Sequence, residues 1–125
     1  MKKSMAISVL LFFFILPPAQ AQLAHTTWQG TMLLETNTNV FWRFDKDTTQ
    51  VNVVADSSLV ERMTYKTEPG ILYLVKVSGI SSCDNQIVGK YKYVIKEDKL
   101  YLSLISDSCS DRSGAISSDP YIKIK

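Results

Sequence analysis

Hydrophobic and polar residues alternate with a period of two along most of the chain after Ala24. Such alternation is typical of β-strands that bury one face and expose the other to solvent. No stretch after Ala21 keeps the helical period of about 3.6 residues over ten residues. The alternation predicts eight strands, at residues 28–34, 40–45, 51–55, 59–66, 71–77, 87–96, 99–105 and 121–124.

Turn-forming residues separate these strands and set the predicted topology. They cluster at residues 37–39, 45–47, 56–58 and 68–70. Residues 110–116 are the one candidate for a helical turn, just before the last strand. Short strands joined by tight turns predict an all-β protein, an antiparallel up-and-down meander of about eight strands. Closure into a barrel hides the edge strands, so we expect a barrel, with an open sandwich as the alternative.

The first 21 residues match a secretory signal peptide. Two lysines precede an almost unbroken apolar run at 7–16, and Ala19-Gln20-Ala21 is an A-x-A cleavage site. The run covers about ten residues, whereas a transmembrane helix needs roughly 20, so a retained membrane anchor is the less favoured alternative. We therefore expect an exported protein, periplasmic or extracellular, with a signal peptide at 1–21 and one mature domain at 22–125.

The charge balance argues against two classes of partner. Of the 14 basic residues, Lys2 and Lys3 belong to the predicted signal peptide, so the mature domain has 12 basic and 12 acidic side chains. A neutral domain without a basic stripe predicts neither a nucleic-acid partner nor binding to an anionic lipid surface. We also expect no stable membrane insertion once the signal peptide has been cleaved.

Two cysteines, Cys83 and Cys109, flank a predicted hairpin. Its strands at 87–96 and 99–105 meet at a short acidic turn, so the cysteines lie outside its far ends. An antiparallel hairpin brings its outer ends together, and exported proteins commonly form disulfides. We predict a Cys83–Cys109 disulfide, with two free buried thiols as the alternative.

Four short motifs follow one another in an order typical of one protein family. They are Trp28-x-Gly30, Gly89-x-Tyr91-x-Tyr93, a Leu-x-Leu-x-Leu strand from Leu100, and Asp107-x-Cys109-x-x-Arg112. In this order the chain resembles the small secreted lipocalin-like proteins of bacteria, within the broader calycin group. The strand order is similar over nearly the whole mature domain, while the specific motifs lie between Gly89 and Arg112.

The resemblance implies a β-barrel in which Trp28 packs under Arg112 at the closed end. A guanidinium over an indole contributes about 0.5–2 kcal/mol. The alternatives for Arg112 are an ion pair with Asp107 or Asp111, or a solvated position in a loop. Typical lipocalins are longer and begin Gly-x-Trp, whereas this chain has Trp28-Gln29-Gly30. The barrel should therefore be smaller, with a small or filled cavity.

One predicted strand places a carboxylate among inward-facing apolar residues. In the strand at 59–66, Glu61 shares its parity with Met63 and Tyr65. A carboxylate inside a barrel is costly unless it is paired or near water, and a polar group at that depth orients a ligand. An exposed position at an open rim is the favoured alternative for Glu61. The predicted ligand-binding residues are Trp42, Glu61, Met63, Tyr65 and Tyr73.

The sequence offers no catalytic or metal-binding constellation. Its one histidine, His25, precedes the predicted barrel and has no thiolates or acidic cluster at ligand spacing. We therefore expect no enzymatic activity, no cofactor and no metal, and we predict a binder of a small hydrophobic ligand. The alternative is a small exported barrel that inhibits an enzyme or binds a protein through its loops. A hollow interior favours the first function, and a packed interior favours the second.

Overall fold

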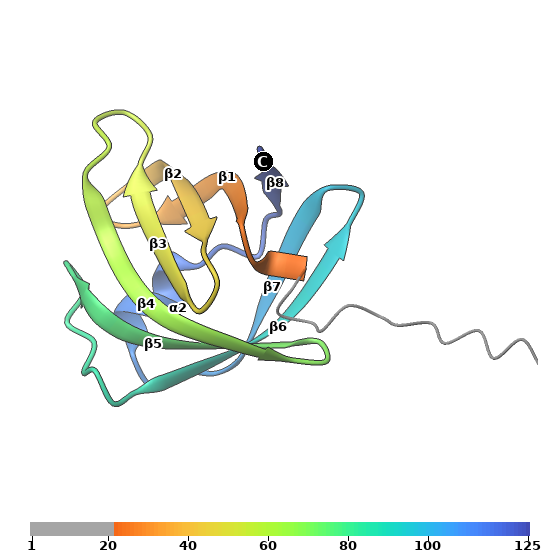
Figure 1. Cartoon of the computed structure of the whole chain (residues 1–125). Coiled ribbons are helices and arrows are strands. Elements are labelled where there is room, and N and C mark those ends of the chain that lie inside the picture. The colour runs from red at the N-terminus through yellow and green to blue at the C-terminus, as the bar shows by residue number, and fades with distance from the viewer. Residues whose placement is uncertain (1–21) are drawn as a thin grey trace, which may run out of the picture.

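The computed structural model describes residues 22–125, which form a closed β-barrel (Figure 1). Its elements are β1 (Thr26–Leu33), β2 (Asn37–Phe44), β3 (Thr48–Val53), β4 (Leu59–Glu68), β5 (Ile71–Gly79), β6 (Val88–Lys96), β7 (Lys99–Ser106), α2 (Ser110–Ala115) and β8 (Tyr121–Lys123). Each strand pairs antiparallel with the next in sequence, and β8 pairs with β1 to close the barrel. This order confirms the predicted meander and its short helix before the last strand. The predicted signal peptide lies outside the described residues.

Alternating burial along the strands puts one face of each strand into the barrel core. In β2, Trp42 and Phe44 are fully buried, while Arg43 between them is exposed. The two aromatic rings stack with their centres 5.4 Å apart, and Tyr121 of β8 meets Trp42 edge-on at 5.4 Å. A β-carbon at Gly30 would lie 2.3 Å from Cδ1 of Tyr121, so glycine makes room for this ring. These contacts join β2 through the core to β8, the strand that closes the barrel.

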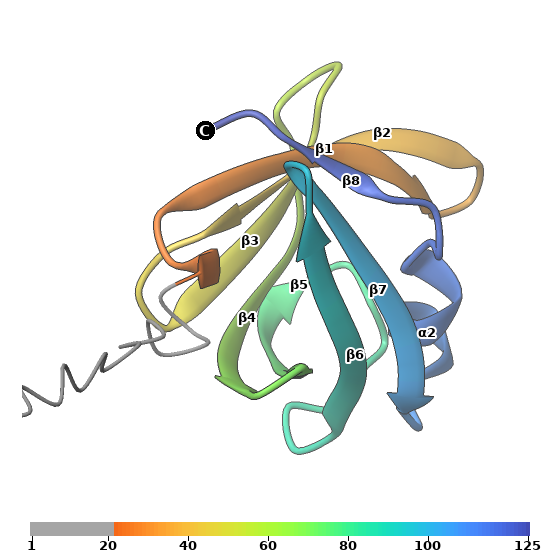
Figure 2. The same cartoon turned by 90° about the vertical axis from the view of Figure 1, so that its right-hand side faces the viewer.

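The two ends of the barrel are built differently (Figures 1 and 2). Leu23 lies in the short turn before β1 and is fully buried in the core. Its carbonyl accepts a hydrogen bond from the hydroxyl of Thr26, which accepts one from Nε1 of Trp28 at 2.8 Å. The helix α2 lies at the opposite end. The N-terminal turn therefore covers one end of the barrel, and α2 flanks the other.

One predicted connection is wrong. The expected turn at 37–39 lies inside β2, because Asn37 pairs with Leu33 and the chain reverses at residues 34–36 instead. Asparagine is common in turns, but here strand pairing along the length of β1 and β2 overrides that preference. The hairpin of β1 and β2 is therefore longer than the sequence predicts, and its turn reaches the end of the barrel that α2 flanks.

Candidate functional site

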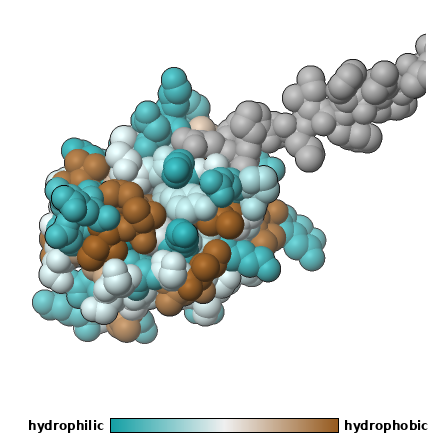
Figure 3. All heavy atoms as spheres, turned by 90° about the horizontal axis from the view of Figure 1, so that it is seen from below, coloured by the Kyte–Doolittle hydropathy of each residue, from teal (hydrophilic) through white to brown (hydrophobic). Residues whose placement is uncertain are grey.

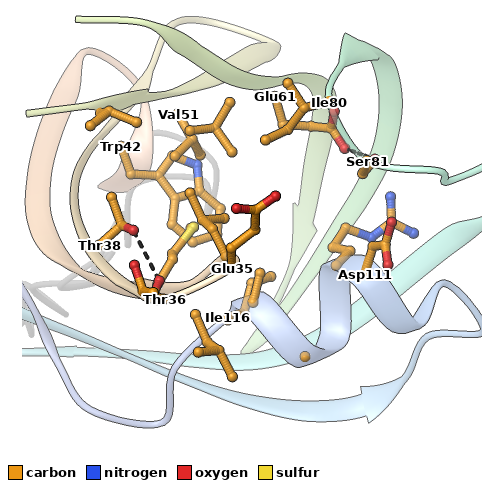
Figure 4. A pocket seen from close by; sticks show the side chains of 18 of the residues that line it. Glu35, Thr36, Thr38, Trp42, Val51, Glu61, Ile80, Ser81, Asp111 and Ile116 are labelled. Atoms are coloured by element: carbon orange, nitrogen blue, oxygen red, sulfur yellow. Dashed lines mark hydrogen bonds between the residues drawn. The ribbon is translucent and has the colours of Figure 1, made fainter. Parts of the chain in front are cut away.

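The barrel contains a cavity of about 690 Å³ at the end flanked by α2 (Figure 4). Its walls come from the turn between β1 and β2, from β3 and β4, from the loop after β5, and from α2. A cluster of buried apolar side chains that reaches back to Leu23 fills the interior toward the N-terminal turn. The barrel is thus packed at one end and hollow at the other.

Apolar side chains form much of the cavity wall. Trp42, Val51 and Met63 are almost fully buried and line its inner part. The indole of Trp42 is held in place, because its Nε1 donates a hydrogen bond to Oγ1 of Thr49 at 2.6 Å. At the mouth the lining includes Ile80, which is 71% exposed. The cavity therefore has a rigid apolar floor and an open rim.

Glu61 places a carboxylate in this apolar wall. The residue is only 6% exposed, so it points inward and is not an exposed rim residue. One carboxylate oxygen, Oε2, accepts a hydrogen bond from the hydroxyl of Ser81. The other, Oε1, is buried and has no hydrogen-bond partner among the residues that the structure describes. Gly79 leaves space for it, because a β-carbon there would lie 2.0 Å from Oε1.

Hydrogen bonds from β5 and α2 hold the loop that carries Ser81. Nζ of Lys76 in β5 donates to the carbonyl of Ser81. The amide and the hydroxyl of Ser82 both donate to Oδ2 of Asp111 in α2, at 2.8 and 2.7 Å. These two hydrogen bonds lower the pKa of Asp111. The hydroxyl of Ser81 therefore faces Glu61 from a segment anchored on both sides.

A disulfide joins the same loop to the start of α2. Cys83 and Cys109 are bonded, with their Cα atoms 5.4 Å apart and a sequence separation of 26. The bond confirms the pairing predicted from the sequence. It connects the loop after β5 to the residue that precedes α2, so two walls of the cavity are linked covalently.

Arg112 of α2 is buried beside the cavity and is paired with Asp107. Its Nε and Nη2 donate to the two carboxylate oxygens of Asp107 at 2.6 and 2.9 Å, and Nη2 also donates to the carbonyl of Ile87 at 3.1 Å. The hydroxyl of Tyr91 donates to Oδ2 of Asp107 at 2.5 Å. A β-carbon at Gly89 would lie 2.5 Å from the same oxygen. The ion pair is bidentate, which is among the strongest geometries for these groups, and glycine makes room for it.

Burial and hydrogen bonding shift the acid–base behaviour of this cluster. Burial opposes ionisation of Asp107, but hydrogen bonds from Arg112, Tyr91 and the amide of Cys109 outweigh it and hold its pKa below the ordinary value. Burial, followed by the hydrogen bond to Asp107, raises the pKa of Tyr91. Asp107 is therefore ionised and Tyr91 is neutral near neutral pH.

The structure places Trp28 and Arg112 differently from the pairing that the family resemblance implies. In the described part of the chain, Lys66 and Lys90 make cation–π contacts with the ring of Tyr73, whereas the guanidinium of Arg112 lies against a carboxylate. Its guanidinium takes the alternative partner Asp107, because a bidentate carboxylate compensates a buried cation better than an indole face does. Trp28 is nevertheless fully buried, on the side of the N-terminal turn.

Of the five predicted ligand-binding residues, three line the cavity and two do not. Tyr65 is buried, but its hydroxyl donates to the carbonyl of Asp45 at 2.6 Å, and burial raises its pKa to about 12. Tyr73 has the parity opposite to the buried leucines of β5, and its hydroxyl donates to Oε2 of Glu68 at 2.9 Å. Both tyrosines therefore make contacts within the barrel wall and not with the cavity. The residues that do line the cavity are Trp42, Glu61 and Met63.

Sequence reasoning missed the part of the site that lies outside the strands. Ile80 and Ser81 follow β5, where alternation ends, and Ile116 follows α2. No periodic pattern marks such residues. The one signal that points to them is the predicted disulfide, since Cys83 lies two residues after Ser81 and brings this loop to α2.

The chemistry of the site is suited to binding. Among residues 22–125, no group of three or more His, Cys, Asp or Glu side chains could hold a metal ion. His25 lies before β1, in the turn at the other end of the barrel. In the same part of the chain, none of the helices is long and apolar enough to cross a membrane. An apolar wall with one inward carboxylate can hold and orient a small molecule.

Comparison with family models gave no match, and comparison with curated proteins and with solved structures gave none either. The closed eight-stranded meander is consistent with a calycin-like fold. Function is therefore inferred from the barrel and its cavity.

Proposed function

We propose that this protein is a small exported, lipocalin-like barrel that binds a small, mostly apolar ligand in the cavity beside α2. The observation that carries the proposal is the cavity itself. Its volume of about 690 Å³ lies within the range of roughly 300–1,000 Å³ that is typical of small-molecule sites. A packed interior would favour the protein-binding alternative, and this barrel is hollow at one end.

Export is supported by two independent features. The first residues have the pattern of a signal peptide, and the Cys83–Cys109 disulfide is typical of proteins in oxidising compartments. The ligand would then be a molecule present in the periplasm or outside the cell.

The outer surface also carries exposed apolar side chains. On the face seen in Figure 3, apolar side chains of the described residues lie in separate groups among polar ones. The exposed large apolar side chains include Leu33 and Ile80, and others lie on β6, β7 and β8, where Val94 and Tyr101 are cross-strand partners. Exposed apolar residues are common on protein surfaces, so the proposal rests on the cavity.

The size of the apolar body can be estimated from the affinity it must supply. Each buried methylene contributes about 0.8 kcal/mol, and a micromolar dissociation constant corresponds to about 8 kcal/mol. We therefore expect a ligand whose apolar body is equivalent to about ten methylene groups.

Titration with N-phenyl-1-naphthylamine, a neutral dye that fluoresces in apolar surroundings, tests the proposal. We expect saturable binding to the oxidised protein. Val53→Trp fills the cavity from β3 and should weaken the dye affinity by about tenfold or more, which equals about 1.4 kcal/mol. The matched control is Val94→Trp, which places the same side chain on an exposed position of β6 and should leave the affinity unchanged.

Two results would contradict the proposal. One is the absence of saturable binding for the dye and for a panel of lipids and small aromatic compounds, in folded protein with an intact disulfide. The other is equal loss of affinity in the Val53→Trp and Val94→Trp proteins, which would place the dye outside the cavity.

A further inference from the structure

The buried carboxylate of Glu61 is only partly satisfied by the protein. Oε2 accepts a hydrogen bond from Ser81, but Oε1 is buried and has no partner among the described residues. Glu61 belongs neither to the Arg43–Asp45 ion pair nor to the Arg112–Asp107 ion pair. A buried carboxylate without a cation or a full set of hydrogen bonds costs folding free energy. In a binding cavity, such a group indicates a ligand that completes it.

The other charges around the cavity have mostly the same sign. The charged side chains that line it are Glu35, Glu61, Asp111 and Arg112. Figure 4 shows the three carboxylates set around the cavity. The one cation, Arg112, is bidentate to Asp107, which compensates its charge. The cavity therefore presents a net negative charge to its contents.

The lining residues offer little to an anionic head group. Lys76 is not one of them, and its ammonium donates to the carbonyl of Ser81. Nη1 of Arg112 is buried without a hydrogen-bond partner, but with the charge of Arg112 already compensated it suits a neutral oxygen acceptor. A ligand carboxylate would also lie near Glu61, and like charges repel strongly in a poorly solvated site.

We propose that the ligand carries a protonated amine, which donates a hydrogen bond to Glu61 while its apolar body lies against Trp42 and Met63. This inference rests on the proposed binding function. In Figure 4, Glu61 and Ser81 lie on one side of the cavity and Trp42 lies on the other. The amine head group and the apolar body of the ligand can therefore contact different walls. The terminal torsion of a glutamate side chain is broad, so the carboxylate can rotate to present an oxygen to a donor. The resulting hydrogen bond is charge-assisted, which makes it roughly twice as strong as a neutral one.

Three probes with the same ten-carbon chain test this head-group preference: decylamine, 1-decanol and decanoate. Each displaces N-phenyl-1-naphthylamine from the oxidised protein near neutral pH, and the displacement gives its affinity. We expect decylamine to bind about tenfold more tightly than decanoate or better, with decanol between them. Decanoate binding as tightly as decylamine would overturn the amine assignment and leave the binding function standing. Failure of the dye and of all three probes to bind would overturn the binding function itself.

The substitution Glu61→Gln separates the charge from the shape of this side chain. We expect the affinity for decylamine to fall about tenfold and that for decanol to stay unchanged. Glu68→Gln is the matched control, because Glu68 is an exposed carboxylate at the end of the same strand and does not line the cavity, so this variant should keep the amine preference. An undiminished preference in Glu61→Gln would overturn the assignment. If that variant fails to fold, the comparison of decylamine with decanoate in the unaltered protein decides the same question.

Discussion

One carboxylate, Asp107, organises the chain between β7 and α2. It accepts hydrogen bonds from Arg112, Tyr91 and the amide of Cys109, and so ties α2 to β6. The side chain of Asp107 is 0% exposed and that of Arg112 is 3% exposed. Removing one partner of such a buried pair leaves a charge uncompensated, and this costs more than the pair itself contributes. Asp107 is therefore a structural residue that positions the wall of the cavity.

We predict that Asp107→Asn lowers the free energy of unfolding by about 3–5 kcal/mol near neutral pH. The pKa of Asp107 in the folded protein lies below its unfolded value of about 3.9. The ionised Asp107 therefore stabilises the folded protein fully above its unfolded-state pKa. This stabilisation is lost as the pH falls through the folded-state pKa. Urea unfolding near neutral pH and at about pH 3 measures the free energy of unfolding of the unaltered protein and of Asp107→Asn. The difference between them should be smaller at the acid pH.

Asp111→Asn is the matched control for this prediction. It removes an exposed carboxylate from the same helix, so its effect on the free energy of unfolding should be smaller than that of Asp107→Asn. A difference in the free energy of unfolding between the unaltered protein and Asp107→Asn that did not depend on pH would contradict the role assigned to the carboxylate.

At the scale of elements, strand alternation was enough to predict the strands of the meander, and the need to hide edge strands favoured their closure into a barrel. Each strand has one buried and one exposed face, and a period of two reports that arrangement directly. The same parity pointed Glu61 to the inner face of β4 with Met63, and the exposed rim position that we favoured for Glu61 was wrong. Alternation does not report where strand pairing ends, which is why the start of β2 at Asn37 was predicted as a turn.

The candidate site was only partly predictable, because half of its wall is not periodic. The loop at residues 80–87 and the helix α2 have no alternation that says which side chains face inward. Spacing along the chain also left Arg112 with several possible partners. Its pairing with Asp107 depends on Gly89 of β6, which leaves room for that carboxylate, and sequence order alone does not reveal this contact.

The disulfide holds these non-periodic elements together, and its removal should affect both stability and binding. We predict that Cys83→Ser with Cys109→Ser lowers the free energy of unfolding by about 3–4 kcal/mol, as chain entropy gives for a loop of this size. The dye affinity should fall as well, because the loop that carries Ser81 is no longer fixed to α2. Urea unfolding and dye titration measure the two effects, and reduced wild-type protein provides a second sample. Unchanged dye affinity in a folded double variant would show that the disulfide does not shape the cavity.

At the scale of the whole molecule, one end of the barrel interior is packed and stabilises the fold, while the other end holds the cavity proposed for binding. A small domain buries a smaller fraction of its surface than a large one, so a fully hollow barrel of this size would lack a sufficient core. Here the core cluster extends from Leu23 through Trp28 to Trp42, while the cavity takes the end beside α2. Trp42 belongs to both parts, because it packs in the core and lines the cavity.

The two tryptophans make this division directly measurable. Trp42 lines the cavity, and its Nε1 donates to the fully buried Thr49, whereas Nε1 of Trp28 donates to Thr26 near the N-terminal turn. The measurement is heteronuclear NMR of the isotope-labelled, oxidised protein during titration with N-phenyl-1-naphthylamine. We predict a saturable shift of the Trp42 indole resonance while that of Trp28 stays in place. Equal shifts of both resonances, or no shift of either in folded protein, would contradict a ligand site at this end of the barrel.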